Sequence, residues 1–265
     1  MPPFWRRFSA PRKISDRTWN ACLAAYPFLR RVGPDRLTRL RAMGEAFLAS
    51  KRFAGEGGIR VDDSIGVAIA AQACLPVLEL GLHWYDDFEQ IIVYPDQFLV
   101  PRRNVDAAGV VHEETVWLAG ETIDGGPVVL SWADAEPMAA SDVFNVVIHE
   151  FVHKLDLRDG EADGVPPLPP ARRREWIRTL DEAFERFNGM IDEVEAAIPP
   201  SVDPDGPEGQ SFYDALPLDS YAAEDPAEFF AVAGEAFFLT PDRFRSAFPA
   251  LSEEFERFFG LRLRG

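Results

Sequence analysis

The chain has 265 residues, of which 47% are apolar and 27% are charged. This length and composition are typical of a soluble globular protein that can bury a sizeable core without disulfides or a structural metal. The formal net charge of −17 argues against binding nucleic acid through a general electrostatic surface.

The charge is distributed unevenly along the chain. Residues 1–43 carry ten Arg and Lys against two Asp and Glu, a local charge of +8, so the remaining residues carry −25. A basic N-terminal arm could dock on the acidic body or on a partner, but a solvated helical face folded onto its own domain is the favoured interpretation.

Two further features bear on the cellular compartment. Cys22 and Cys74 are far apart in apolar surroundings with no CxxC motif, which predicts buried, reduced thiols. The basic N-terminal sequence is not followed by an apolar stretch of signal-peptide length, and no run approaches the roughly 18 apolar residues of a membrane span. We therefore expect a cytoplasmic protein.

The first third of the chain predicts helices. Residues 15–31 form one helix with Ser15 as a candidate N-cap, and residues 34–53 form a second that starts at Pro34. Residues 62–82 are apolar on nearly every side, which predicts a buried helix that Pro76 ends or kinks.

The middle third predicts strands. Residues 90–95, 109–120 and 126–132 are short, rich in β-branched and aromatic residues, and separated by Gly, Pro and Asp. Mainly helical signals return after Ser141. We expect one α+β domain over residues 1–265, in which the helical residues 1–55 could be a loosely attached subdomain.

The segment "SDVFNVVIHEFVHKLD" carries the strongest functional signal. On a helix capped by Ser141, an apolar stripe lies on one side, and His149 and His153 project from roughly the opposite side on adjacent turns. Two such imidazoles can bind one tetrahedral zinc, and Glu150 beside them can take a proton from a water and pass it to the leaving amine. The alternative is an amphipathic helix that happens to carry two histidines.

A catalytic zinc normally has three protein ligands, so one is missing from this motif. The longer metzincin pattern requires a histidine where Asp159 stands. The remaining histidines, His83 and His112, lie upstream and stay open as candidates, although a downstream carboxylate is the commoner solution.

Glu228 is the best candidate for the third ligand. Asp225 and Pro226 predict the start of a helix in which Glu228 could equally be the glutamate of a capping box. Glu228 and Glu235 are seven residues apart and therefore share a helix face, where one could bind a metal while the other orients a histidine. Spacing alone does not decide which of the two is the ligand.

Five segments together resemble the Mlc titration factor A family of bacterial zinc-dependent peptidases. The resemblance runs from about residue 60 to residue 250, and its segments are "CLPVLELGLHWYDDF", "IIVYPDQF", "GPVVLSW", "FNVVIHEFVHKLD" and "YAAEDPAEFFAVAGEAFF". Around the zinc site the family is in turn similar to the catalytic domain of anthrax lethal factor. The resemblance implies a zincin-like α+β domain with a small mixed sheet and additional N-terminal and C-terminal helices.

The resemblance also implies roles for particular residues. His149, His153 and Glu228 would bind one zinc ion, Glu150 would activate the water, and the Tyr221 phenol would donate a hydrogen bond to the oxyanion of the tetrahedral intermediate. The strand in residues 126–132 could be the edge strand that holds an extended peptide, or an interior strand of the sheet.

For function, the resemblance implies aminopeptidase-like hydrolysis of peptides and binding to the glucose-responsive repressor Mlc. From the net charge and the lack of a long apolar run we expect no direct nucleic-acid or membrane contact. The competing hypothesis is a non-catalytic anti-repressor with a vestigial zinc site. Asp156 stays open between a group that orients a histidine and a solvent contact at the helix end.

Overall fold

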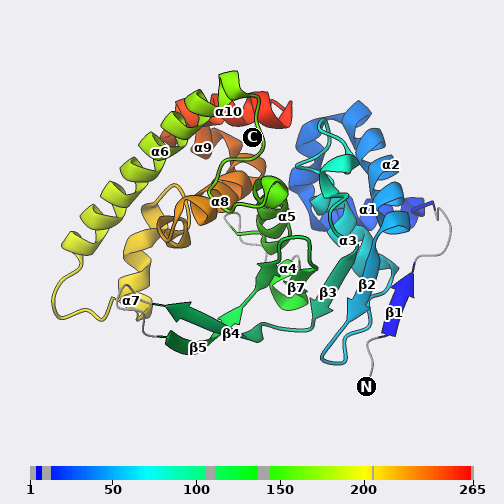
Figure 1. Ribbon diagram of the computed structural model, residues 1–265, viewed down its shortest axis with the longest axis horizontal. Helices are drawn as coiled ribbons and strands as arrows, with labels where there is room; N and C mark the ends of the chain where they lie inside the picture. The colour runs from blue at the N-terminus through cyan, green and yellow to red at the C-terminus, as the bar shows by residue number, and fades with distance from the viewer. Residues whose placement is uncertain (1–3, 8–12, 106–110, 137–143, 205, 264–265) are drawn as a thin grey trace.

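The computed structural model describes residues 4–7, 13–105, 111–136, 144–204 and 206–263. The fold is α+β, as the sequence predicts, with a small mixed sheet and helices at both ends of the chain (Figure 1). The helix α5 (Val146–Asp156), which carries both candidate histidines, lies between the N-terminal helices and the C-terminal ones.

The main sheet has the strand order β1-β2-β3-β7-β6. Its strands are β1 (Phe4–Arg7), β2 (Arg52–Gly55), β3 (Gln90–Tyr94), β7 (Val128–Ser131) and β6 (Gly120–Thr122). The central strands β2, β3 and β7 run parallel, and both edge strands are antiparallel to their neighbours.

The predicted strand in residues 126–132 is therefore an interior strand, and the edge-strand interpretation of this segment is wrong. β7 pairs with β3 on one side and with β6 on the other. All four of its residues are buried, which explains why the segment contains mainly aliphatic residues without polar alternation. The edge that faces the candidate site is β6, a three-residue strand that the sequence did not predict.

A separate antiparallel ribbon is formed by β4 (Phe98–Val105) and β5 (Val111–Leu118). The second of these strands was predicted within residues 109–120, whereas β4, which contains Pro101, was not predicted. Proline is tolerated in a two-stranded ribbon because each strand has one free edge.

The N-terminal helices follow the predicted order. They are α1 (Asp16–Ala25), the 3₁₀ helix η1 (Pro27–Val32), α2 (Pro34–Ser50) and α3 (Asp63–Ala73). Ser15 caps α1 by accepting a hydrogen bond from the backbone N–H of Thr18, and α3 ends before Pro76, as expected. Cys22 and Cys74 are free and buried, also as predicted.

The C-terminal half is almost entirely helical. Its main helices are α6 (Pro170–Ala197), α8 (Pro226–Leu239), α9 (Pro241–Ala247) and α10 (Pro249–Phe259). The shorter ones in this half are η3 (Leu157–Asp159), α7 (Pro207–Gln210), η4 (Ser211–Ala215) and η5 (Ser220–Ala223). Two more short helices come earlier in the chain, η2 (Leu82–Tyr85) and α4 (Trp132–Ala135).

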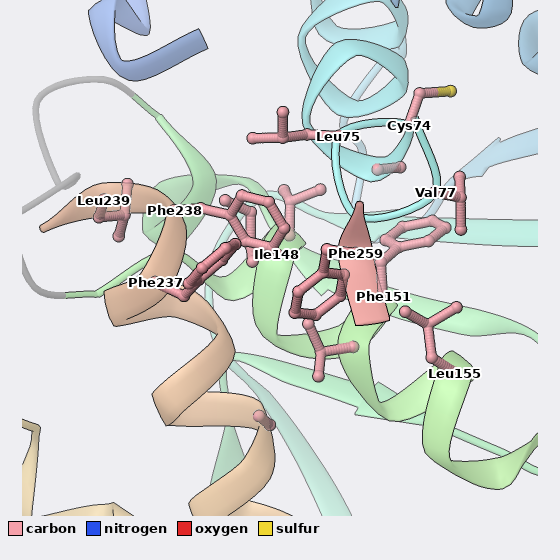
Figure 2. Packing of buried hydrophobic residues seen from close by; sticks show 14 of the residues in the cluster. Cys74, Leu75, Val77, Ile148, Phe151, Leu155, Phe237, Phe238, Leu239 and Phe259 are labelled. Atoms are coloured by element: carbon pink, nitrogen blue, oxygen red, sulfur yellow. The ribbon is translucent and has the colours of Figure 1, made fainter. Parts of the chain in front are cut away.

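One hydrophobic cluster connects the two halves of the chain. Figure 2 shows Ile148, Phe151 and Leu155 of α5 packed among side chains from the end of α3, from α8 and from α10. Buried residues of α1 and α2 belong to the same cluster. A single domain remains our prediction for the organisation of the chain. None of the helices in the described ranges is long and apolar enough to cross a membrane.

Candidate metal centre

The helix α5 starts later than predicted. Ser141, the expected N-cap, lies outside the described residues, and the helix begins at Val146. Asn145 is the N-cap, and its Oδ1 accepts a hydrogen bond from the backbone N–H of Ile148 at 2.9 Å. The predicted apolar stripe is buried against the core, with Phe144 preceding the helix.

The two histidines lie on adjacent turns with their rings close together. The ring centroids of His149 and His153 are 4.7 Å apart, and the two Nε2 atoms are separated by 3.1 Å. Both nitrogens therefore point to the same small space, as the spacing of four residues predicts.

Glu228 from α8 completes this group. Its Oε2 is 3.0 Å from Nε2 of His149 and 3.2 Å from Nε2 of His153. The N-terminus of α8 is capped by Asp225, whose Oδ1 accepts hydrogen bonds from the backbone N–H groups of Ala227 and Glu228. The Glu228 side chain is thus directed to the histidines while Asp225 caps the helix.

These three groups fit a divalent metal. The atoms of the described residues that could bind an ion, one each from His149, His153 and Glu228, lie within 4.8 Å of one another. Ligand atoms at 2.0–2.1 Å from a tetrahedral zinc are separated by about 3.3 Å, close to the distances found between these nitrogen and oxygen atoms. Two imidazoles and one carboxylate also leave one coordination position open.

The electrostatics of the metal-free group favour a cation. Burial lowers the pKa of the His149 imidazole, but hydrogen bonds with Glu228 and Glu235 outweigh burial and raise this pKa well above its ordinary value. Burial raises the pKa of Glu228, but the hydrogen bonds with both histidines outweigh it and hold the pKa below the usual range. The carboxylates therefore attract a proton to the position that a metal ion would take.

Glu235 contacts His149 at Nδ1, the ring nitrogen that is not directed to Glu228. Its Oε1 is 2.8 Å from Nδ1 of His149, and its Oε2 accepts a hydrogen bond from the backbone N–H of Asn145. The carboxylate is fully buried. When Nδ1 of His149 donates to Glu235, Nε2 is the nitrogen that can bind a metal. Glu228 therefore lies at the possible metal position, and Glu235 contacts the other ring nitrogen of His149. The spacing of the two glutamates had left this assignment undecided.

The close approach of α8 to α5 depends on a glycine. A Cβ atom on Gly234 would lie 2.9 Å from Cγ2 and 3.2 Å from Cγ1 of Val152. Because Gly234 has no side chain, α8 packs directly on the helix that carries the histidines, and the neighbouring Glu235 reaches His149.

Glu150 lies in the wall of a cleft of about 490 Å³ that also contains both histidines, Tyr221 and Glu228. Its carboxylate is buried, and Oε2 accepts a hydrogen bond from the Thr122 hydroxyl at 2.7 Å. Burial raises the pKa of Glu150, and this effect is opposed by the charges of His149 and His153 and by the Thr122 hydrogen bond.

Tyr221 is on the cleft wall, in η5. Its side chain is 41% exposed, and its ring centroid is 6.1 Å from that of His149. Asp219 caps this short helix by accepting a hydrogen bond from the backbone N–H of Tyr221. The tyrosine thus faces the cleft beside the candidate metal ligands, in the region where the resemblance implies it.

The other candidates lie elsewhere. His83 is in η2 and is not among the described residues that line the cleft or converge on the possible metal position. His112 is in β5, opposite Asn104. Asp156 is fully buried, so the interpretation as a solvent contact at the helix end is wrong; its Oδ2 accepts a hydrogen bond from the backbone N–H of Gly164.

Three residues of this site were not predicted from the sequence. Thr122 contacts Glu150, Asn145 caps α5, and Gly120 leaves room for the Glu150 carboxylate. A Cβ on Gly120 would lie 2.3 Å from Oε1 of Glu150. Asn145 could have been identified from its cap position, but β6 is too short to give a periodic signal.

Comparison with known proteins identifies relatives that match nearly the whole chain. The chain is 36% identical to Mlc titration factor A of Escherichia fergusonii over 265 residues, which cover 98% of this chain and 93% of the relative. It is 37% identical to Mlc titration factor A of Cronobacter sakazakii over 256 residues, covering 95% and 90% of the two chains. It is also 37% identical to Mlc titration factor A of Salmonella schwarzengrund over 245 residues, covering 92% and 86%.

A family profile matches nearly the whole chain. The profile is described as glucose-regulated metallo-peptidase M90, and it matches residues 4–260. This range includes α5, α8 and the edge strand β6. The chain therefore belongs to the M90 family of glucose-regulated metallopeptidases.

Proposed function

We propose that this protein is a zinc-dependent peptidase with aminopeptidase-like activity, in which Glu150 is the general base. The observation that carries the proposal is the convergence of His149 Nε2, His153 Nε2 and Glu228 Oε2 beside the Glu150 carboxylate in one cleft. The family is that of metallopeptidases, so a metal is expected. Zinc is the ion we propose, because it commonly binds such a set of two imidazoles and one carboxylate.

The bound zinc would supply a Lewis acid that polarises the scissile carbonyl and makes a water molecule more acidic. Glu150 accepts the proton of the attacking water at its carboxylate and transfers it to the nitrogen of the leaving amine. The raised pKa of Glu150, which results from burial, suits a group that must both accept and return a proton.

We assign a different role to Tyr221. Its phenol donates a hydrogen bond to the oxyanion that develops on the substrate carbonyl, which stabilises the transition state more than the ground state. The position of the ring in the cleft, 6.1 Å from the His149 ring centroid, supports this assignment. We propose peptides or proteins in the cytoplasm as substrates.

The test combines metal analysis with a peptide-library cleavage assay on the wild type and on Glu150→Gln. We expect one zinc per chain in both proteins, chelator-sensitive cleavage by the wild type and almost no turnover by the variant. Glu224→Gln is the matched control, since Glu224 is an exposed glutamate shortly before α8. Full activity of Glu150→Gln would overturn the assigned mechanism.

A second function is favoured by the name of the relatives, Mlc titration factor A. We propose that this chain also binds a repressor similar to Mlc and thereby lowers its free concentration. The two functions are compatible, because a peptidase can also sequester a partner. Binding of purified Mlc to Glu150→Gln in calorimetry would show that catalysis is not required, and failure of all forms to bind would leave the peptidase alone.

A further inference from the structure

The edge strand β6 packs against the helix that carries the candidate general base. Gly120 and Thr122 are two residues apart on this strand and therefore point to the same face of the sheet. Both of them contact Glu150. Along one edge, β6 pairs with β7, and this pairing joins β6 to the parallel strands of the sheet.

The Thr122 hydroxyl contacts Glu150 at two places. It lies 2.7 Å from Oε2 of the carboxylate and 3.0 Å from the backbone carbonyl oxygen of the same residue. A hydroxyl has one proton to donate, and an ionised carboxylate is the stronger acceptor. The contact with the carbonyl holds the Thr122 hydroxyl next to the backbone of α5. The Glu150 carboxylate, which binds this hydroxyl, therefore has a defined position relative to the helix.

The backbone of Gly120 lies close to the Glu150 side chain and limits its possible positions. A Cβ atom there would lie 2.3 Å from Oε1, 2.6 Å from Cγ and 2.7 Å from Cδ of Glu150. These distances are far below van der Waals contact, so any other residue would displace the carboxylate or the strand. Glycine at this position is required by the packing of Glu150 and not by an unusual backbone conformation, since Gly120 is not among the glycines with positive φ.

We propose that Thr122 and Gly120 are positioning residues that hold the Glu150 carboxylate in one orientation for proton transfer. This proposal rests on the peptidase function proposed above. The glutamate side chain has several rotatable bonds, and proton transfer requires the carboxylate within hydrogen-bond reach of the attacking water. A hydrogen bond on one oxygen and a close backbone on the other remove most of this freedom before the substrate arrives.

The proposal distinguishes the rate of the chemical step from substrate and metal binding. Thr122 contacts neither histidine and does not contact Glu228 in the described structure. Loss of its hydroxyl should therefore lower kcat while KM and the zinc dissociation constant stay within about twofold of the wild type. A general structural defect would change all three quantities and the melting temperature together.

The experiment compares Thr122→Val with Thr122→Ser. Valine keeps the shape of threonine without the hydroxyl. We expect kcat to fall by about 10- to 100-fold, because a misplaced base loses only part of the roughly 10²- to 10⁴-fold that general acid–base catalysis contributes. Serine keeps the hydroxyl and is expected to retain most of kcat. Thr240→Val is the matched control, because its hydroxyl contacts the Ala236 carbonyl at the end of α8, outside the cleft lining.

A second readout does not depend on activity. Crystal structures of metal-free Thr122→Val and Thr122→Ser should show the Glu150 carboxylate turned away from β6 in the first variant and unchanged in the second. Gly120→Ala should displace the same carboxylate by steric contact and lower kcat further. If the carboxylate keeps its place in Thr122→Val, the proposal is overturned.

The outcomes separate this proposal from the peptidase function. If the wild type cleaves no peptide, the peptidase function fails, and the crystal structures still decide whether Thr122 positions Glu150. If the wild type is active and Thr122→Val matches it, the positioning role fails while the peptidase function stands. Equal losses in the Val and Ser variants would also overturn the proposal, because the hydroxyl would then have no part in the effect.

Discussion

Glu235 on α8 and His149 on α5 are 86 positions apart in the chain, and the distance from Oε1 of the carboxylate to Nδ1 of the imidazole is 2.8 Å. The other carboxylate oxygen accepts from the backbone N–H of Asn145, where α5 starts. One buried carboxylate therefore contacts both the start of α5 and the ring of a candidate metal ligand.

Glu235→Gln should weaken zinc binding by about 10- to 100-fold, the usual effect of losing a carboxylate behind a metal-binding histidine. The amide still reaches His149, but it lacks the negative charge that makes Nε2 a stronger ligand. The measurement is a zinc dissociation constant from competition with a chromophoric chelator. Glu254→Gln is the control, since Glu254 is a buried glutamate on α10 that pairs with Arg172 and Arg257. Unchanged zinc affinity in Glu235→Gln would contradict the prediction.

Zinc binding should release a proton at neutral pH. The metal-free His149 has a pKa well above its ordinary value, because the hydrogen bonds with Glu228 and Glu235 outweigh burial. Its Nε2 must lose that proton to bind the metal, so the apparent affinity rises as the pH approaches the raised pKa and levels off above it. Titration calorimetry in buffers of different ionisation enthalpy should detect about one proton released per zinc at pH 7. Zinc binding without proton release at pH 7 would be incompatible with this assignment.

Asp156 should make the metal-free protein less stable as the pH rises from 4 to 7. Burial raises the pKa of its carboxyl to about 7 from 3.8, against the opposing hydrogen bond from Gly164. In this window the folded protein holds a proton that the unfolded chain releases, so the free energy of unfolding falls by at most about 4 kcal/mol.

Asp156→Asn resembles the protonated form and should remove this pH dependence. The measurement is the free energy of unfolding in urea, with a chelator present, between pH 4.5 and pH 8. We expect the variant to gain stability relative to the wild type as the pH rises. Asp192→Asn, at an exposed position on α6, is the control. Parallel curves for the wild type and Asp156→Asn would refute the prediction.

Gly234→Ala should disturb the contact between α5 and α8. The added Cβ would lie 2.9 Å from Cγ2 of Val152, which is closer than packed carbon atoms normally come. We expect a loss of about 1–3 kcal/mol in the free energy of unfolding, together with weaker zinc binding because Glu235 moves with its helix.

Gly189→Ala on α6 is a control with the opposite sign. A Cβ there meets no atom within 4 Å, and alanine is favoured over glycine inside a helix by roughly 0.5–1 kcal/mol. Thermal and urea unfolding of both variants gives the comparison. Equal stabilisation of the protein by both substitutions would show that the two helices do not depend on Gly234 for their approach.

Much of the fold could be predicted because its signals are local. The caps of α1 and α8, the apolar stripe of α5 and the proline after α3 each act within a few residues of the chain. The short strands β1, β2 and β6 could not be predicted in this way. Three or four residues are too few to establish a period, and their pairing depends on partners far away in the chain.

In the candidate site, too, the residues with a local signal could be predicted, and those that depend on distant contacts could not. His149, Glu150 and His153 come from one helical turn pattern, whereas the choice of Glu228 over Glu235 depends on how α8 lies against α5. The sequence left β7 undecided between an edge and an interior strand, because β6, which pairs with its other side, gives no signal of its own. Thr122 was missed for the same reason.

His153 and Glu228 meet although 75 positions separate them. The free energy needed to close such a loop rises only with the logarithm of its length, so doubling the intervening segment would add about 0.6 kcal/mol. The long helix α6 and the short helices after it occupy this segment (Figure 1). Leu216 and Leu218 of this segment are buried in the core, whereas residues 199–204 directly after α6 are mostly exposed. A reporter domain inserted in residues 199–204 should therefore have little effect on the metal centre.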